Sequence, residues 1–249
     1  MTAVLANRIP NGSPRYRGGD PRERLIVALD VSTAAAAQKI VAAVGESALT
    51  YKVGMQLYTA VGPQIVRDLV ASGRRVFLDL KYHDIPNTVG AAVAEAEKLG
   101  VSMLTVHSAG TSKMLRAAVE AAKTRPALMV LAVTVLTSMD GHDLETLGVC
   151  GSVEDTVLRL ATLALASGCQ GVVTSAREAS KLRANLGDRF ALVTPGVRPA
   201  GSSVGDQVRV VTPAEAIASG ASHIVVGRPI TEAADPAAEA RAILGQITS

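Results

Sequence analysis

The chain has 249 residues, of which 48% are hydrophobic and 2% aromatic, with a formal net charge of +3. Its length suits one α/β barrel of roughly 250 residues, and the few aromatic rings exclude the base-stacking surface of single-stranded nucleic-acid binders. No apolar run reaches the roughly 18 residues that cross a membrane. The two cysteines, Cys150 and Cys169, make no disulfide framework. We therefore expect a cytoplasmic protein without a membrane partner.

Residues 1–20 differ in composition from the rest of the chain. They contain several arginines, Pro10, Pro14 and the Gly18–Gly19 pair, and they show no hydrophobic periodicity. This composition is typical of a flexible extension, so we expect one catalytic domain over residues 21–249. A basic arm that binds nucleic acid would need a long block of like charges. The segment has none, and no nucleic-acid partner is expected.

Short apolar runs alternate with longer alanine-rich amphipathic runs from residue 25 onward, which indicates strands followed by helices. The expected strands are 25–30, 50–54, 75–80, 102–107, 127–135, 170–174, 190–194 and 223–227. The expected helices are 33–44, 62–72, 87–99, 111–124, 153–167, 176–185, 213–219 and 235–246. Ser32 or Thr33 can cap the first helix. Gly73 and Gly100 follow the second and third helices.

Eight expected strands, each followed by a helix, predict a single (β/α)8 TIM barrel with a parallel eight-stranded sheet. A doubly wound open sheet is the alternative. No G-x-G-x-x-G motif follows the first strand, which weakens a dinucleotide-binding version of that alternative.

Polar side chains gather where the expected strands end, which is where barrel enzymes hold their working groups. The starts of the strands are poorer in such side chains. We therefore expect a convergent site at this rim and interpret His107 as a support for it. The strand ends carry Asp30, Lys52, Asp79, Lys81, His107 and, beyond the fifth strand, Thr137.

The segment Asp-Leu-Lys-Tyr-His-Asp-Ile-Pro-Asn-Thr, residues 79–88, is the most informative run in the chain. Asp79 and Lys81 are two apart on an expected strand, so both side chains project from the same face. Asp84 follows three residues later. An ammonium held between carboxylates beside a buried strand is costly to desolvate. A salt bridge at the strand end is the structural alternative to a catalytic role.

The loops after the seventh and eighth strands are where barrels commonly bind phosphate. They offer Arg198, the glycine- and serine-rich segment 201–207, and the Gly227–Arg228 pair. Glycine lets backbone N–H groups approach an anion closely, and arginine can donate two hydrogen bonds to it. A turn with solvated arginines is the alternative, but two such elements in the two expected loops favour a phosphate site.

Several motifs in this order give the chain a specific resemblance to the orotidine 5′-phosphate decarboxylase family, of the bacterial type, over roughly residues 22–245. The D-x-K-x-x-D core alone is shared with sugar-phosphate lyases and decarboxylases of the same superfamily, whereas its Ile-Pro-Asn-Thr continuation is far more specific. The motifs are Ala-Leu-Asp (28–30), Tyr-Lys-Val-Gly (51–54), the run 79–88, Thr-Val-Leu-Thr-Ser-Met (134–139), Thr-Pro-Gly-Val-Arg (194–198), Gly-Asp-Gln (205–207) and Val-Val-Gly-Arg-Pro-Ile (225–230).

The resemblance implies cofactor-free decarboxylation of orotidine 5′-monophosphate to uridine 5′-monophosphate and CO2, in pyrimidine biosynthesis, without a metal. It implies that Lys81 is the proton donor in a charge array Lys52–Asp79–Lys81–Asp84. It also implies a homodimer with shared active sites, in which Asp84 and Thr88 reach the neighbouring subunit's site. The implied substrate-binding residues are Asp30 and Lys52 at the ribose, Asp79, Thr88, Thr137 at the pyrimidine edge, and Arg198, Gln207, Gly227 and Arg228 at the phosphate.

This chemistry needs a preplaced cation. Loss of CO2 from C6 of the pyrimidine leaves a carbanion with no adjacent electron sink, so the protein must stabilise the charge electrostatically. Asp79 beside the substrate carboxylate would disfavour the ground state more than the transition state. Phosphate bound at the opposite end would supply remote binding energy and help to close a lid. Segment 199–206 is the lid candidate.

Two other functions stay open on the sequence alone. A sugar-phosphate lyase with a divalent metal would need a further carboxylate at a strand end, where Lys52 and His107 stand instead. Insensitivity to a chelator would separate it from the decarboxylase. A non-catalytic nucleotide-binding protein would keep the phosphate site without needing the charge array, and a turnover assay would identify it.

Overall fold

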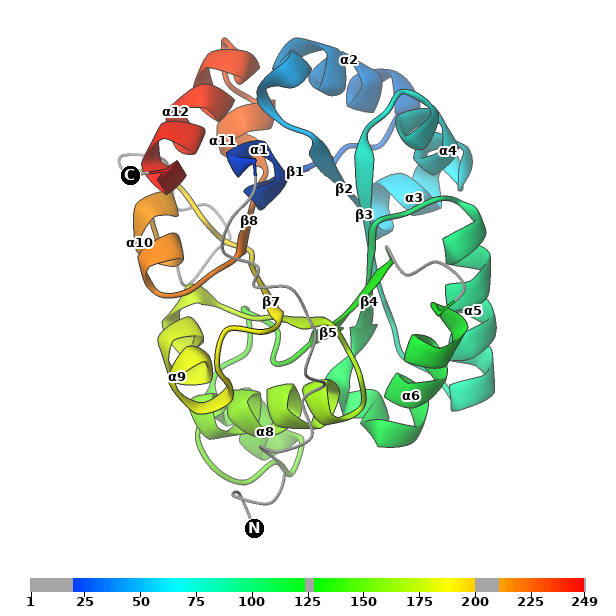
Figure 1. Ribbon diagram of the computed structural model, residues 1–249, viewed down its shortest axis with the longest axis vertical. Helices are drawn as coiled ribbons and strands as arrows, with labels where there is room; N and C mark the ends of the chain where they lie inside the picture. Colours follow the sequence, from blue (N-terminus) through cyan, green and yellow to red (C-terminus); the bar gives the residue numbers. More distant parts are fainter. Residues whose placement is uncertain (1–19, 124–127, 200–210, 249) are drawn as a thin grey trace.

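The computed structural model describes residues 20–123, 128–199 and 211–248. Eight parallel strands form a closed barrel in the order β1 to β8, and helices surround it (Figure 1). This confirms the predicted (β/α)8 fold and excludes the open sheet. Apart from Asp20, the expected N-terminal extension lies outside the described residues.

The strands agree with the predicted ones to within a few residues at each end. The largest difference is in β5, which is two residues shorter at each end; β3 continues two residues further than expected, and β1 ends two residues earlier. The strands are β1 (Leu25–Ala28), β2 (Thr50–Gly54), β3 (Arg75–Tyr82), β4 (Met103–His107), β5 (Met129–Val133), β6 (Gly171–Val173), β7 (Ala191–Thr194) and β8 (His223–Val226).

Each expected helix has a counterpart. The main helices are α2 (Ala34–Val44), α4 (Gln64–Ala71), α5 (Pro86–Lys98), α6 (Thr111–Ala121), α8 (Val153–Ala166), α9 (Ala176–Leu186), α10 (Pro213–Ala218) and α12 (Pro236–Thr248). Thr33 caps α2 by accepting a hydrogen bond from the Ala36 N–H. Gly73 and Gly100 adopt positive φ after α4 and α5, as the sequence predicts.

Shorter helices stand in the connections, and the sequence did not indicate them. Residues 62 and 63, expected to open the second helix, instead separate α3 from α4: Gly62 adopts a φ of 71° at the end of α3, and Pro63 is the N-cap of α4. The capping box of Asp140 and Asp143 begins α7. The short helices are α1 (Pro21–Arg24), η3 (Gly45–Ser47), α3 (Met55–Val61), η4 (Ser108–Gly110), α7 (Gly141–Thr146) and α11 (Arg228–Thr231).

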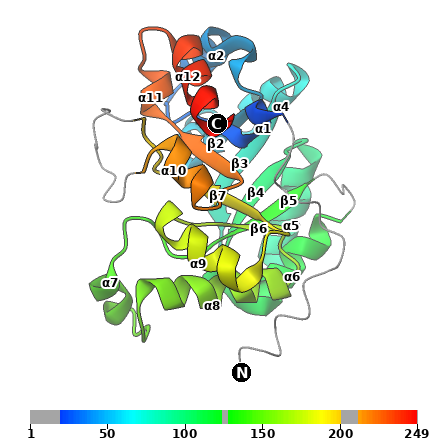
Figure 2. The ribbon, with the colours of Figure 1, turned by 60° about the vertical axis from the view of Figure 1, so that its left-hand side comes forward.

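Apolar side chains fill the barrel and separate its two ends. One cluster of buried residues lies between strands and helices. A second, smaller cluster fills the barrel interior, with Phe77, Met103 and Leu131 among its largest members. Because side chains alternate along a strand, residues two apart point inward and form this plug. The helices pack around the strand layer in both views (Figures 1 and 2).

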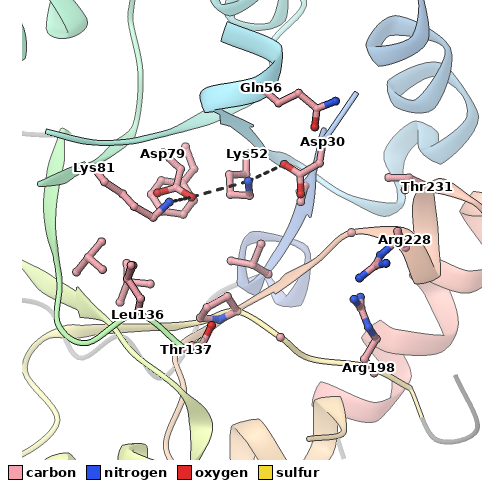
Figure 3. A pocket seen from close by; sticks show the side chains of 18 of the residues that line it. Asp30, Lys52, Gln56, Asp79, Lys81, Leu136, Thr137, Arg198, Arg228 and Thr231 are labelled. Atoms are coloured by element: carbon pink, nitrogen blue, oxygen red, sulfur yellow. Dashed lines mark hydrogen bonds and ion pairs between the residues drawn. The ribbon is translucent and has the colours of Figure 1, made fainter. Parts of the chain in front are cut away.

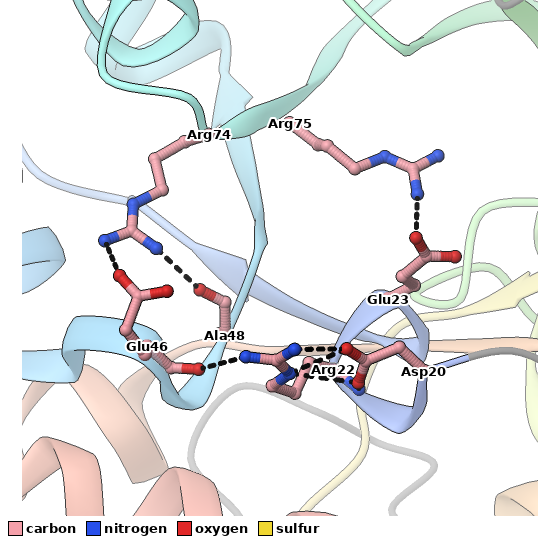
Figure 4. A network of polar contacts seen from close by, with 7 residues as sticks. All are labelled: Asp20, Arg22, Glu23, Glu46, Ala48, Arg74 and Arg75. Atoms are coloured by element: carbon pink, nitrogen blue, oxygen red, sulfur yellow. Dashed lines mark hydrogen bonds and ion pairs between the residues drawn. The ribbon is translucent and has the colours of Figure 1, made fainter.

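Ion pairs connect the segments at the amino ends of the strands. Arg75 pairs with Glu23 at 3.0 Å and Arg74 with Glu46 at 2.9 Å, and Arg22 joins Asp20 to the carbonyl of Glu46 (Figure 4). Of these side chains only Arg75 lies within a strand; the others come from the connections. These side chains neutralise one another across neighbouring connections and tie α1 to the bottom of the barrel.

His223, at the start of β8, is buried among basic side chains. Its Nδ1 lies 3.1 Å from the Ser222 hydroxyl. Burial lowers the pKa of His223 to about 4, and the charges of Arg75, Arg24 and Arg183 act in the same direction. The folded protein therefore holds this imidazole neutral at pH values where an exposed histidine would be protonated.

The stability of the protein should fall in mild acid because of His223. Its pKa is about 4 when folded against 6.5 for the ordinary group, so its contribution is fully present above pH 6.5 and is lost as the pH falls toward 4. Between pH 7 and pH 5 the loss should be about 2 kcal/mol. Urea unfolding at several pH values should show a shallower pH dependence for His223→Gln. Identical slopes would contradict the assignment.

Candidate active site

A cavity of about 580 Å³ lies at the carboxyl ends of the strands. Its floor is the top of the inner apolar plug, formed by Ala28, Phe77 and Val225. Its walls hold most of the polar residues that the sequence singled out. Those that line it are Asp30, Lys52, Asp79, Lys81, Thr137, Arg198, Gly227 and Arg228.

Four charged side chains form a row of alternating sign along one wall (Figure 3). Lys52 Nζ lies 2.9 Å from Asp30 Oδ1 and 3.8 Å from Asp79 Oδ2. Asp79 Oδ2 is also 3.0 Å from Lys81 Nζ. The Asp79 side chain is only 14% exposed, so little water screens its contacts with the two ammonium groups. Within one chain Asp30, rather than Asp84, occupies the end of the row.

Lys81 has an unusual backbone conformation, with a φ of 53°. The pairing of β3 with β4 is regular up to Leu78, then shifts and resumes at Tyr82. Lys81 therefore lies in a bulge. Its N–H donates to the Oγ1 of Thr105 on β4 at 2.9 Å. A left-handed conformation in a lysine costs roughly 1–2 kcal/mol and indicates a functional constraint.

Sequence reasoning did not single out three residues that lie beside the charge row. Thr105 had no signal beyond its place in the expected strand 102–107, although the alternation of Met103, Thr105 and His107 places it on the inward face. Gln56 lines the cavity and donates a hydrogen bond to the Ser32 hydroxyl. Gly54 appeared only within a motif, yet a Cβ at that position would lie 2.9 Å from Lys52 Nζ.

Two arginines form the opposite side of the cavity, where their guanidinium groups point toward each other (Figure 3). Arg198 is 6% exposed, and its Nε has no hydrogen-bond partner among the residues described. Burial lowers the pKa of Arg198, the charge of Arg228 lowers it further, and Glu232 opposes them. Two like charges at close quarters, one with an unused buried donor, fit an anion between them.

Two of the predicted site residues are described but are not brought into this cavity. Asp84 and Thr88 are exposed and lie outside its lining. The Asp84 carboxylate accepts a hydrogen bond from the N–H of Ile85 at 2.6 Å. Gln207 and most of the lid candidate 199–206 lie outside the described residues. His107 does not line the cavity either; its Nδ1 accepts a hydrogen bond from Ala109 N–H at 3.4 Å, as a rim support would.

Neither a metal-ligand cluster nor a membrane-spanning helix is found within residues 20–123, 128–199 and 211–248. No group of three or more His, Cys, Asp or Glu side chains there is arranged to hold a metal ion. No helix in this part of the chain has the length and apolar character needed to cross a bilayer.

The fold and the cavity define a barrel enzyme with charged working groups at the carboxyl ends of its strands. Residues 23–243 match the model of the orotidine 5′-phosphate decarboxylase / HUMPS family. The chain is 53% identical to orotidine 5′-phosphate decarboxylase of Afipia carboxidovorans, over 92% of this chain and 96% of that protein. It is 52% identical to the protein of the same name from Halorhodospira halophila, over 91% and 96%.

Solved structures agree with these sequence comparisons. The crystal structure of orotidine 5′-phosphate decarboxylase from Lactobacillus acidophilus superposes with a TM-score of 0.82 at 39% identity, covering 91% of this chain and all of that one. The chain therefore belongs to the orotidine 5′-phosphate decarboxylase / HUMPS family, which confirms the resemblance in its sequence motifs.

The tight space at Gly54 gives a test of the charge row. In Gly54→Ala the new Cβ would lie 2.9 Å from Lys52 Nζ and 3.4 Å from Asp30 Oδ1, so the ammonium must move. Misplacement on this scale should lower the kcat/KM for decarboxylation by at least about tenfold. Gly141→Ala is the matched control, because its Cβ would meet nothing within 4 Å. Equal kcat/KM in the two variants would show that the position of Lys52 is unimportant.

Proposed function

We propose that this cavity decarboxylates orotidine 5′-monophosphate with Lys81 as the proton donor and without a cofactor. One observation carries the proposal: Lys81, Asp79, Lys52 and Asp30 form a row of alternating charge facing a pair of arginines across one cavity. Such an arrangement suits a substrate that is anionic at both ends.

The overall reaction is the conversion of orotidine 5′-monophosphate to uridine 5′-monophosphate and CO2, so the protein is a carboxy-lyase of pyrimidine nucleotide biosynthesis. Proteins of that name share about half of their residues with this chain over nine tenths of its length. The specific run 79–88 carries two members of the charge row, Asp79 and Lys81.

Lys81 acts where negative charge develops. The bond between C6 and the carboxylate breaks, CO2 leaves, and the electron pair remains on C6. The Lys81 ammonium stabilises that pair and then transfers a proton to C6; the neutral amine takes a new proton from water. Asp79, 3.0 Å from Lys81 Nζ, holds the ammonium in place before the reaction. This is preorganised electrostatic stabilisation combined with general acid catalysis.

Arg198 and Arg228 bind the phosphate group in this proposal. The buried Arg198 guanidinium has an unused Nε donor and faces Arg228, so a dianionic phosphate between them would relieve the repulsion and satisfy the donor. At Gly227 the absence of a side chain lets the phosphate approach the backbone. Gln207 is the fourth proposed phosphate contact and lies outside the described residues.

The remaining contacts orient the nucleoside. Asp30 and Lys52 lie between the arginines and Lys81 in Figure 3 and are placed to bind the ribose hydroxyls. Thr137 follows β5 on the cavity wall, and its hydroxyl would meet the pyrimidine edge. Each end of the substrate then has its own binding group, and C6 is directed to the Lys81 ammonium.

The partner in this proposal is a second copy of the chain. Asp84 and Thr88 are exposed and do not line the cavity of their own chain, and neighbouring Ile85 is a large apolar side chain that is 66% exposed. In a homodimer with shared sites, Asp84 and Thr88 would complete the cavity of the other subunit. A cytoplasmic location fits a biosynthetic enzyme of this kind and stays a prediction.

Replacing Lys81 should abolish catalysis but not binding. Lys81→Ala should lower the turnover of orotidine 5′-monophosphate, followed by absorbance with a chelator present, by at least about a thousandfold. Binding of uridine 5′-monophosphate should remain measurable by calorimetry because the arginines are intact. Lys123→Ala, at an exposed lysine paired with Glu120, is the control. Near-normal turnover by Lys81→Ala would refute the role of Lys81, and wild-type activity that the chelator removes would favour the metal-dependent lyase.

Shared sites can be tested by mixing inactive variants. Lys81→Ala and Asp84→Ala proteins that exchange subunits should regain activity, because a hybrid dimer has one site with both native residues; about a quarter of all sites would be restored. Lys81→Ala mixed with Asp79→Ala is the matched control. It should stay inactive, since Asp79 and Lys81 act from one chain at 3.0 Å. No recovery in the first mixture, despite proven exchange, would contradict the shared site.

A further inference from the structure

We propose that Thr105 is a positioning residue that sets the geometry of the Asp79–Lys81 pair. The proposal deepens the function above and rests on it. Thr105 is 1% exposed and does not line the cavity. It therefore has no contact with a substrate, and any effect on catalysis must pass through the residues that it holds.

The Thr105 hydroxyl makes two hydrogen bonds, both to the catalytic segment of β3. Its Oγ1 accepts from the N–H of Lys81 at 2.9 Å and donates to Asp79 Oδ1 at 2.9 Å. A hydroxyl has one proton to donate, and here Asp79 receives it. One side chain thus holds the backbone of the proton donor and the carboxylate that orients its ammonium.

The bulge in β3 explains why this side chain is needed. The register pairs Leu78 with Leu104 and Tyr82 with Val106, so three residues of β3 face Thr105 alone. In a parallel ladder the residues of β3 bond alternately to β2 and to β4: the Arg75 N–H donates to Leu49 on the β2 side, and the Val76 carbonyl accepts from Ser102 on the β4 side. In a regular register the Lys81 N–H would therefore face β2, beyond the last β2–β3 pair of Gly54 with Asp79. With the register shifted, and Lys81 at a φ of 53°, this N–H turns to β4 instead, where the threonine hydroxyl accepts it.

The same hydroxyl decides which oxygen of Asp79 faces the lysines. Because Oδ1 accepts from Thr105, Oδ2 is turned toward Lys81 Nζ at 3.0 Å and Lys52 Nζ at 3.8 Å. Without the hydroxyl the carboxylate could rotate about its terminal bond, and Lys81 would lose both its backbone anchor and its oriented partner. The ammonium would then be held less closely to the reacting carbon.

Three substitutions separate the hydroxyl from the shape of the side chain. Thr105→Val keeps the shape and loses the hydroxyl, Thr105→Ser keeps the hydroxyl, and Thr105→Ala loses both. Kcat should fall at least about tenfold in the Val and Ala variants and stay within about threefold in Ser. KM, and the Kd of uridine 5′-monophosphate, should change less than about twofold in all three. Thr50→Val is the control, since the buried Thr50 hydroxyl of β2 has no partner among the described residues.

Amide hydrogen exchange gives a readout that needs no turnover. The N–H of Lys81 should exchange faster in Thr105→Val than in Thr105→Ser. Unchanged kcat in Thr105→Val, or a Ser variant as impaired as the Ala variant, would overturn the positioning role. If Thr105→Val does not fold, the Ser and Ala pair decides alone. Absence of turnover by the wild-type protein would refute the proposed function instead, while the exchange rates would still report on the hydrogen bond.

Discussion

One carboxylate holds the site together. Asp79 Oδ2 lies between two ammonium groups, 3.0 Å from Lys81 Nζ and 3.8 Å from Lys52 Nζ, and without it the two cations would repel each other apart. With Asp30 the row holds two charges of each sign. In the proposed reaction, a substrate carboxylate beside Asp79 would add a negative charge that departs as CO2, so the row would interact more favourably with the transition state than with the bound substrate.

Charged side chains have different surroundings at the two ends of the barrel. At the amino ends, Arg74 and Arg75 pair with Glu46 and Glu23, and these ion pairs hold neighbouring connections together. At the carboxyl ends, the charges face a cavity whose floor is apolar and includes Phe77. Low-dielectric surroundings strengthen every interaction above that floor. The inner plug therefore supports the chemistry as well as the fold.

The sequence predicted the barrel and most of the cavity because both follow from regular repetition. Strand–helix alternation indicates the fold, and the carboxyl ends of parallel strands meet at one rim, which gathers Asp30, Lys81 and Arg198. Two features had no such signal. The break between α3 and α4 depends on how Gly62 ends one helix, and Asp84, which the resemblance places in the charge array, lies outside the cavity of its own chain. Hydrophobic periodicity reports only on regular helices and strands, so it predicts neither the helix break nor the place of Asp84.

The bulge at Lys81 is where β3 departs from regular strand geometry, next to the charge row. In a regular register the Lys81 N–H would face β2, because odd residues of β3 such as Arg75 bond to the β2 side and even ones such as Val76 to the β4 side. The shift between Leu78 and Tyr82 turns this N–H toward Thr105 of β4 and places the lysine in a left-handed conformation. Strain of this kind persists only when surrounding contacts outweigh it. Thr105 and Asp79 supply such contacts, so the conformation of Lys81 depends on β4 as much as on β3.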